Sequence, residues 1–206
     1  MSESVPPKPD TQAEPPVGRR EVVRWLWRLP VLAALGGAGW GVWEAYHVHF
    51  DKVSPDAPAF VPLTPQRVAG IGELTELWSA VTFELQTAAG TTPALVLNVP
   101  EAVAGGLEHD RQHFLAFSRV CTHQGCPVGL QRDLETLAVA FNYRTDAPAL
   151  ACPCHLSVFA PLQAGKAVSG PAREPLPRVQ LEARGTDLWA VGLEPRRSSS
   201  SSDPAP

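Results

Sequence analysis

The chain has 206 residues, and its 21 acidic and 17 basic side chains give a formal net charge of −4 at pH 7. This length allows one domain of ordinary size with extensions, and the acidic balance argues against nucleic acid as a partner. The 22 prolines exceed the ordinary frequency and gather at the ends of the chain and in linkers. Residues 1–18 are rich in Pro, Glu and Ser and nearly free of large apolar groups, which predicts a disordered N-terminal tail.

An apolar segment with a basic flank follows this tail. Arg19–Arg24 fits the twin-arginine export pattern, and Leu29–Trp43 carries no charged residue. The uncharged run is shorter than the ~20 residues that a spanning helix needs, but flanking tryptophans and arginines can extend it by anchoring in the interface. We therefore expect residues 19–46 to form one transmembrane helix with its basic end in the cytoplasm. A signal peptide cleaved near residues 36–38 is the alternative.

The rest of the chain reads as a linker, a β domain and a second tail. Residues 47–65 predict a semi-stiff extended linker, with prolines at 55, 58, 62 and 65. Residues 66–193 predict an all-β domain, a small antiparallel β-sandwich or barrel. Its short apolar runs lie at 75–86, 94–99, 113–120, 134–143, 179–183 and 188–191. Arg184–Asp187 predicts a hairpin turn between the last two, and the Ser-rich residues 194–206 predict a disordered tail.

Two short boxes carry the chemistry of the chain. Cys121–Cys126 reads C-T-H-Q-G-C and Cys152–Phe159 reads C-P-C-H-L-S-V-F, and together they contain all four cysteines. Each box supplies one cysteine and one histidine, with a second cysteine close by. Two thiolates and two imidazoles are the ligands of a Rieske-type [2Fe–2S] cluster, in which histidines replace cysteines on one iron. The boxes therefore predict such a cluster.

A structural zinc site and a domain with two disulfides are the alternatives for these boxes. A Cys₂His₂ set suits tetrahedral zinc, whose paired ligands are usually separated by roughly two to five residues. Here each histidine lies only one or two places from a cysteine. A zinc site also has no use for the serine and the aromatic residue that follow the second histidine. The spacing therefore favours the iron–sulfur cluster.

The boxes resemble those of the Rieske iron–sulfur subunit of cytochrome bc complexes, whose pattern reads C-T-H-x-G-C and then C-P-C-H-x-S-x-[YF]. The resemblance implies that Cys121 and Cys152 bind the inner iron and that His123 and His155 bind the outer, more exposed iron. Residues 169–177 look like the proline loop that covers the cluster in this family. The resemblance also implies that the N-terminal anchor is retained in the mature protein.

Four further residues take roles from the same resemblance. Cys126 and Cys154 match the cysteines that form a disulfide between the two cluster loops. Ser157 matches a serine that hydrogen-bonds a bridging sulfide. Phe159 stands where a tyrosine often donates to a ligand sulfur. A donor to a cluster sulfur stabilises the reduced state, so its absence should lower the reduction potential.

The chain also departs from the family pattern within the boxes. Gln124 replaces a leucine that docks on cytochrome b in the family, and Leu156 replaces a frequent glycine. A leucine at that place implies either an ordinary backbone conformation or a little strain. These departures, like the missing hydroxyl of Phe159, leave the predicted cluster ligands in place.

The function implied by the resemblance is that of an electron-transfer subunit in a quinol–cytochrome c oxidoreductase. His155 would accept the hydrogen bond of the quinol at the cytochrome b pocket, and His123 and His155 would take up a proton with the electron. The head would then swing on the linker as a hinge and deliver one electron to a c-type cytochrome. The location implied is the bacterial cytoplasmic membrane, crossed once, with the head on the periplasmic side, where a disulfide persists.

Other functions share some of these features. The small subunit of a molybdenum oxidase that acts on arsenite also carries a Rieske cluster and an export signal. A soluble Rieske ferredoxin or oxygenase needs neither the extra cysteines nor an anchor, and no 2-His-1-carboxylate iron site of an oxygenase is apparent in the sequence. A zinc-binding adaptor without redox activity is a further class. The sequence favours the quinol-oxidising complex among them.

Overall fold

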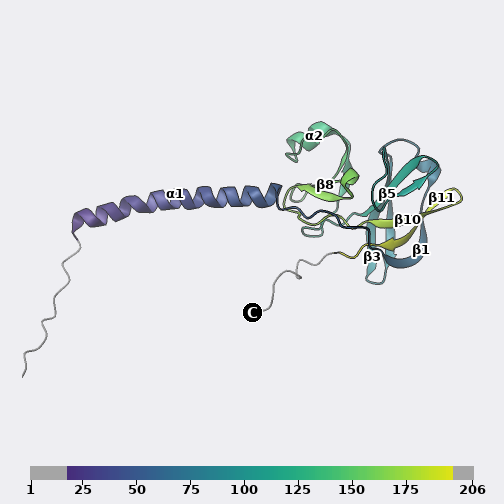
Figure 1. Ribbon diagram of the computed structural model, residues 1–206, viewed down its shortest axis with the longest axis horizontal. Helices are drawn as coiled ribbons and strands as arrows, with labels where there is room; N and C mark the ends of the chain where they lie inside the picture. The colour runs from purple at the N-terminus through teal and green to yellow at the C-terminus, as the bar shows by residue number, and fades with distance from the viewer. Residues whose placement is uncertain (1–17, 197–206) are drawn as a thin grey trace, which may run out of the picture. The chain divides into compact units, whose positions relative to one another are not determined.

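The computed structural model describes residues 18–196, so most of both predicted tails lies outside the described residues. The described chain begins with the helix α1 (Arg19–His49) and continues with the strands β1 to β11, which form the head of the molecule (Figure 1). The chain divides into two compact units, the first ending at Glu44 and the second beginning at Ala45. The second unit contains all of the predicted metal ligands.

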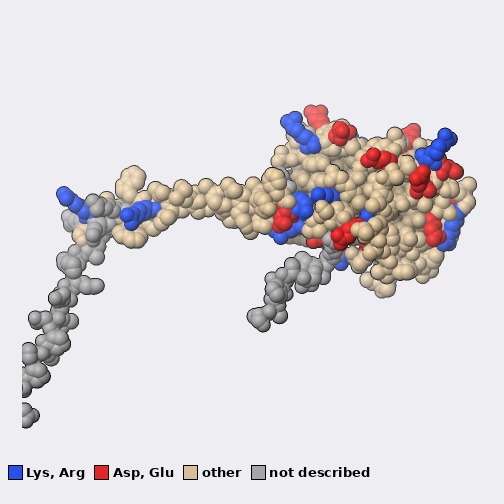
Figure 2. Space-filling model, viewed as in Figure 1, with Lys and Arg blue, Asp and Glu red and all other residues tan. Residues whose placement is uncertain are grey.

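The helix α1 is continuous over its whole length, with Pro30 inside it. Figure 2 shows charged side chains near its N-terminal end and a long uncharged stretch after them. That stretch contains glycines at 36, 37, 39 and 41, which add little apolar surface. Among residues 18–196, no helix has a run that is both long enough and apolar enough to cross a bilayer. The predicted transmembrane anchor is therefore not supported, and the predicted export signal gains no support with it.

Three antiparallel sheets make up the head, which confirms the predicted all-β fold. Their strand orders are β1-β11-β10, β2-β3-β5-β4 and β6-β7-β8-β9. The strands are β1 (Val61–Gly70), β2 (Ala80–Thr87), β3 (Gly90–Val99), β4 (Leu107–His109), β5 (Gln112–Ser118), β6 (Gly129–Gln131), β7 (Ala149–Cys152), β8 (Ser157–Ala160), β9 (Lys166–Ser169), β10 (Val179–Arg184) and β11 (Asp187–Leu193). Two 3₁₀ turns, η1 (Ile71–Glu73) and η2 (Pro161–Gln163), and one short helix, α2 (Leu134–Val139), interrupt them.

The middle strand β3 is buried on both faces. Ala94 and Val96 pack in a core shared with the sheet of β1, β10 and β11. Leu95 and Leu97 alternate with them and pack in a second core, shared with the sheet of β7 and β8. Successive side chains of a strand point to opposite faces, so a strand between two layers needs a continuous apolar run. The apolar run at 94–99 therefore predicts the place of β3 at the centre of the head.

The hairpin predicted at the end of the domain is confirmed. β10 and β11 pair in antiparallel register, with Arg184 opposite Asp187 at the turn. The free edge of β11 pairs with β1, from Val61 opposite Leu193 to Gly70 opposite Asp187. Residues 61–65 thus belong to the head, and the predicted linker boundary at 65 lies inside β1. The prolines at 62 and 65 fit an edge strand, where a missing N–H costs no ladder bond.

The run at 134–143 does not form the predicted strand. Leu134–Val139 is the helix α2 instead. The Asp133 carboxylate caps it, accepting hydrogen bonds from the backbone N–H of Glu135 at 3.0 Å and from the hydroxyl of Thr136 at 2.6 Å. These bonds, the one from Thr136 first, hold the pKa of Asp133 below its usual value. A carboxylate N-cap satisfies orphan donors of the first turn, and that local signal outweighs the apolar run.

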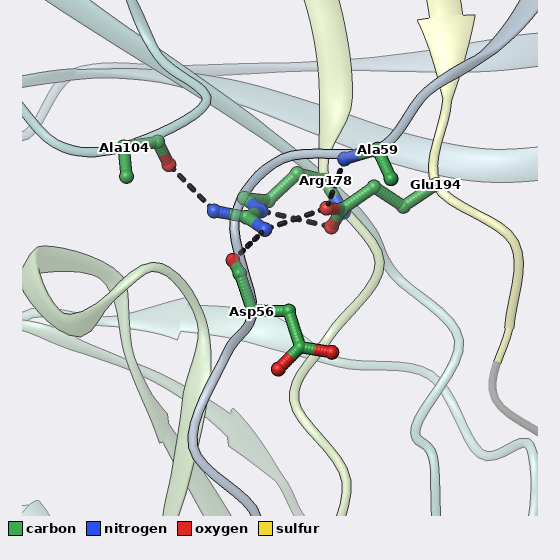
Figure 3. A network of polar contacts seen from close by, with 5 residues as sticks. All are labelled: Asp56, Ala59, Ala104, Arg178 and Glu194. Carbon is green, nitrogen blue, oxygen red and sulfur yellow. Dashed lines mark hydrogen bonds and ion pairs between the residues drawn. The ribbon is translucent and has the colours of Figure 1, made fainter.

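A buried ion pair ties the linker to the head (Figure 3). The Arg178 guanidinium, 3% exposed, donates to the Glu194 carboxylate at 2.6 and 2.8 Å. It also donates to the carbonyls of Ala104 and Asp56, at 2.8 and 2.9 Å. Ala59 N–H donates to Glu194 at 3.4 Å. Removing one partner of such a pair leaves a buried charge unpaired, so the linker around residues 56–59 is fastened to the head.

Candidate metal centre

The first box forms loop 1 (residues 121–126), which follows β5. Its ends are joined by the backbone, because Cys121 N–H donates to the carbonyl of Cys126 at 2.9 Å. Gly125 N–H donates to the carbonyl of Cys121, also at 2.9 Å. Gly125 has φ +79°, a left-handed conformation that glycine adopts without a steric penalty. Loop 1 is therefore held in shape largely by its own backbone.

The second box forms loop 2 (residues 152–157), which connects β7 and β8. Cys152 and Ser157 are paired across the two strands at its base. Between them, Leu156 has φ +59° and leaves 45% of its surface exposed. A left-handed conformation costs roughly 1–2 kcal/mol in a residue with a β-carbon. The backbone at Leu156 is thus strained, the second of the two outcomes that the sequence allowed.

The four cysteines divide into a disulfide and a pair of thiols. Cys126 is bonded to Cys154, which confirms the predicted bridge between the loops. Cys121 and Cys152 are free and buried, and both side chains pack in the same core cluster. Burial raises the pKa of the Cys121 thiol, and the contact with Cys152 raises it as well, against backbone donors that lower it. A metal must displace these protons to bind the thiolates.

The two histidines of the boxes lie beside each other. The ring centroids of His123 and His155 are 4.9 Å apart, with the rings nearly perpendicular. His123 Nδ1 is buried and has no hydrogen-bond partner. Burial, and then the nearby charge of His155, lower the pKa of His123. A neutral imidazole with an unsatisfied buried nitrogen is prepared to bind a metal. His155 is exposed, whereas His123 is half-buried.

The positions of the ligand atoms favour an iron–sulfur cluster over a single zinc ion. Ligand atoms around one tetrahedral zinc lie roughly 3.5–4 Å from one another. Within residues 18–196, the metal-ligating atoms that gather within 4.8 Å are the sulfurs of Cys126, Cys152 and Cys154. Two of these sulfurs are bonded to each other, so they are not available as thiolates. The four predicted ligands instead form a thiol pair and an imidazole pair. Two separate pairs suit a cluster with two irons.

The loop at residues 169–177, the proline loop, packs on both cluster loops. Ala172 N–H donates to the Ser157 hydroxyl oxygen at 3.1 Å. The Thr122 hydroxyl donates to the carbonyl of Glu174 at 2.8 Å. Because the Ser157 oxygen accepts from the backbone, its own proton remains available for another acceptor. The proline loop therefore fixes the hydroxyl that is predicted to reach a bridging sulfide.

The inner side of the site is apolar. Phe159 is fully buried and belongs to the same core cluster as Cys121 and Cys152. Leu150 and Leu176, both fully buried, lie in that cluster as well. An apolar wall excludes water and lowers the local dielectric, which influences the potential of a bound metal group. Phe159 thus packs in the core that holds both predicted thiolate ligands.

Three residues near the site are absent from the sequence-based prediction. Thr122 lies inside the first box, and its hydroxyl is a hydrogen-bond donor that the sequence shows. Arg196 donates to the carbonyl of Cys121 at 2.7 Å from the far end of the chain. Lys52 donates to the carbonyls of the proline loop from the linker. The last two contacts join residues that lie far apart in sequence, and no local pattern signals them.

Characterised relatives of two kinds match part of this chain. Iodate reductase subunit IdrB from Denitromonas iodatirespirans is 36% identical over 94 residues, 45% of this chain and 45% of that protein. The cytochrome bc1 complex Rieske iron-sulfur subunit from Corynebacterium diphtheriae is 37% identical over 68 residues, 33% of this chain and 14% of that protein. The chain therefore spans less than half the length of these relatives.

One solved structure and one family description also match part of this chain. The soluble domain of Rieske protein II from Sulfolobus acidocaldarius is similar with a TM-score of 0.47 at 24% identity, covering 64% of this chain and 78% of that one. Residues 78–180, half of the chain, match the Rieske [2Fe-2S] domain. With two buried thiols and two adjacent imidazoles in that segment, the chain belongs to the Rieske [2Fe-2S] domain family, and its cofactor is a [2Fe-2S] cluster.

Proposed function

We propose that this protein is the one-electron carrier subunit of a molybdenum-containing oxidoreductase similar to iodate reductase. Its partners are a molybdenum subunit, which carries out the substrate chemistry, and a c-type cytochrome. The observation that carries the proposal is the longer match, which extends over 94 residues for an iodate reductase subunit and 68 for a bc1 subunit, at nearly equal identity. This choice corrects the sequence-based preference for a quinol-oxidising complex in favour of its alternative.

The tip of loop 1 supports the same choice. Gln124 is exposed beside His123. The resemblance to bc subunits calls for a leucine at this place, where it docks on cytochrome b. An amide there favours a polar partner surface, because burying it against an apolar pocket without hydrogen bonds costs about 1–3 kcal/mol. Gln124 thus fits a hydrated protein interface better than a quinol pocket.

The residues of the site divide the work of binding and contact. We assign the buried thiols of Cys121 and Cys152 to the inner iron, and His123 and His155 to the outer iron. When bound, a Rieske cluster stores one electron. The exposed His155 lies where a redox partner can approach, while the thiols are shielded from water. Ser157, held by the proline loop, donates toward the sulfide side of the site.

The head belongs in an oxidising compartment in this proposal. The disulfide between Cys126 and Cys154 joins the two loops that carry the ligands. Such bonds persist outside the cytoplasm and are rare in reducing compartments. A location on the extracytoplasmic side therefore accompanies the proposed complex.

A quinol-oxidising cytochrome bc complex remains the second candidate. It is favoured by the match to bc1 Rieske subunits at 37% identity and by the exposed imidazole of His155. In that complex His155 would meet a quinol rather than a protein surface. The two candidates differ in the metal content of the partner, which makes them separable by analysis of the native complex.

The test is purification of the full chain with its partners from the native host. The proposal expects molybdenum in an amount equal to the chain and no b-type haem. After reduction with dithionite, the Rieske spectrum in this complex should return to its oxidised form when iodate is added. A complex with a Cys152→Ser chain is the control for that signal. Copurification of b-type haem without molybdenum would instead assign the chain to a quinol-oxidising complex.

A further inference from the structure

The linker segment at residues 51–53, which we call the strap, lies against the proline loop. Lys52 Nζ donates to the carbonyl of Gly170 and, at 2.7 Å, to the carbonyl of Ala172. The backbone N–H of Val53 donates to the carbonyl of Arg173 at 3.0 Å. Three consecutive contacts thus join the strap to a loop more than 100 residues away in sequence.

Charged side chains reinforce this attachment. The Arg173 guanidinium lies 3.3 Å from the Asp51 carboxylate. His47 Nδ1 lies 2.8 Å from Asp51 and 2.8 Å from Arg173. The hydrogen bond from His47, followed by the charge of Arg173, holds the pKa of Asp51 below its usual value. The strap therefore presents one acidic and one basic side chain, Asp51 and Lys52, to the proline loop.

The ammonium of Lys52 is held at an energetic cost. Desolvation, and then repulsion from Arg173, lower the pKa of Lys52 to about 8, against the attraction of Asp51. Lys166 lines the same surface hollow as Lys52, and His47 is hydrogen-bonded to Asp51. Partly burying a cation disfavours its charged form unless its donors are satisfied. Hydrogen bonds to two carbonyl oxygens offset part of the desolvation of the Lys52 ammonium.

The segment of the proline loop that accepts hydrogen bonds from Lys52 also contacts loop 2. Ala172 N–H is bonded to the Ser157 hydroxyl, and Ala172 C=O is bonded to Lys52. Gly170 has φ +77°, and a Cβ added there would lie 2.5 Å from the carbonyl oxygen of Leu156. Gly170 is thus pressed against loop 2 while its own carbonyl is bonded to Lys52. Because Ala172 is bonded both to Lys52 and to Ser157, a displacement of Lys52 would move the group that is bonded to the Ser157 hydroxyl.

We propose that Lys52 is a positioning residue for the cluster: it holds the proline loop against loop 2 and so fixes the Ser157 hydroxyl. A donor fixed toward the cluster stabilises the reduced state, so the strap raises the reduction potential. The attachment of the linker to the proline loop would thus influence the reduction potential of the cluster. The effect on potential rests on the proposed role of Ser157 at the cluster, whereas the mechanical contact does not.

The experiment compares three variants of the full chain. Lys52→Met keeps the length of the side chain and removes its donors, Lys52→Arg keeps the charge, and Lys166→Met removes a matched charge from the same hollow. The first readout is hydrogen exchange of the peptide that contains Ala172. We expect Lys52→Met to accelerate this exchange by about tenfold, as loss of a charge-assisted bond predicts. Lys52→Arg should restore most of the protection, and Lys166→Met should leave it unchanged.

The second readout is the reduction potential of the cluster by film voltammetry. Lys52→Met should lower it, and by more than Lys166→Met, which tests the charge alone. Equal shifts in these two variants, or unchanged exchange in Lys52→Met, would overturn the positioning role. Accelerated exchange with an unchanged potential would likewise refute the link to the potential, and would place the fault in the role of Ser157. A Lys52→Gln chain, expected to be intermediate, keeps the test decisive if Lys52→Met does not accumulate.

Discussion

Loop 1 and loop 2 carry the same set of side chains, one predicted ligand cysteine, one predicted ligand histidine and one disulfide cysteine, but they are held in shape differently. Loop 1 closes on itself through two backbone bonds between Cys121, Gly125 and Cys126. Loop 2 contains the strained Leu156 and is covered by the proline loop at Ser157. Distant segments bond both loops, at Thr122 and Cys121 in loop 1 and at Ser157 in loop 2. The contrast is that loop 1 is also closed internally by its own backbone, whereas the proline loop packs directly on the backbone of loop 2.

This difference has a consequence for dynamics. A loop held by its own backbone bonds keeps its shape when neighbouring segments move. A loop held from outside follows the segment that covers it, and such regions open with low local free energy. The linker is bonded to that covering segment through Lys52. Changes in the linker should therefore be felt at His155 more than at His123.

The largest expected effect tests whether the two loops share one cluster. Replacing Cys121 or Cys152 by serine should abolish the Rieske spectrum and the bound acid-labile sulfide, since the inner iron then loses one of its two thiolate ligands. His123→Ala and His155→Ala should also abolish that spectrum. Iron, sulfide and electron paramagnetic resonance measurements check all four. Gln124→Ala, an exposed change in loop 1, is the matched control and should retain the cluster.

Retention of the native spectrum in any one of the four variants would remove that residue from the ligand set. Zinc in place of iron in protein from the native host would reject the cluster itself. If variants in loop 1 and loop 2 lose the spectrum, iron and sulfide equally, both loops bind the same cluster. The two loops then differ only in how their backbones are supported.

The next effect concerns the disulfide that joins the loops. Cys126 and Cys154 are 28 residues apart, and a bridge of this span stabilises a protein by about 3.5 kcal/mol through the unfolded chain. A Cys126→Ala/Cys154→Ala chain should lose about that much, as measured by denaturant unfolding. Hydrogen exchange in the same chain should rise more in loop 2 than in loop 1. An equal rise in both loops would contradict their unequal support.

Two glycines with nearly the same backbone give the sharpest contrast. Gly125 has φ +79° with open space around it, and Gly170 has φ +77° against the backbone of loop 2. Alanine at Gly125 should cost about 1 kcal/mol, from the left-handed conformation alone. Alanine at Gly170 should cost about 3 kcal/mol, because overpacking adds to the same strain. Thermal unfolding of both variants checks the difference, and equal costs would mean that the proline loop yields freely.

Local patterns account for much of the fold and for the chemistry of the site. The resemblance of the two boxes to the Rieske pattern implies the disulfide. The run at 94–99 predicts a buried strand, because side-chain type and period act over a few residues. The helix α2 was missed although Asp133 gave a capping signal for it. The bond between Lys52 and the proline loop could not be predicted, since it joins segments more than 100 residues apart in sequence. Contacts that a loop makes with distant segments cannot be predicted from the residue pattern of the loop alone.

The smallest expected effect isolates the strain in loop 2. Leu156→Gly removes the penalty of φ +59° and forfeits little burial, since the side chain is 45% exposed. Glycine also raises the conformational entropy of the unfolded chain, which offsets part of this relief, so the net gain should be about 1 kcal/mol or less. Leu156→Ala keeps the strained backbone and removes the exposed side chain, so it should leave stability nearly unchanged. Denaturant unfolding of both chains decides the cause: if alanine stabilises as much as glycine, exposure of the leucine, and not backbone strain, carries the cost.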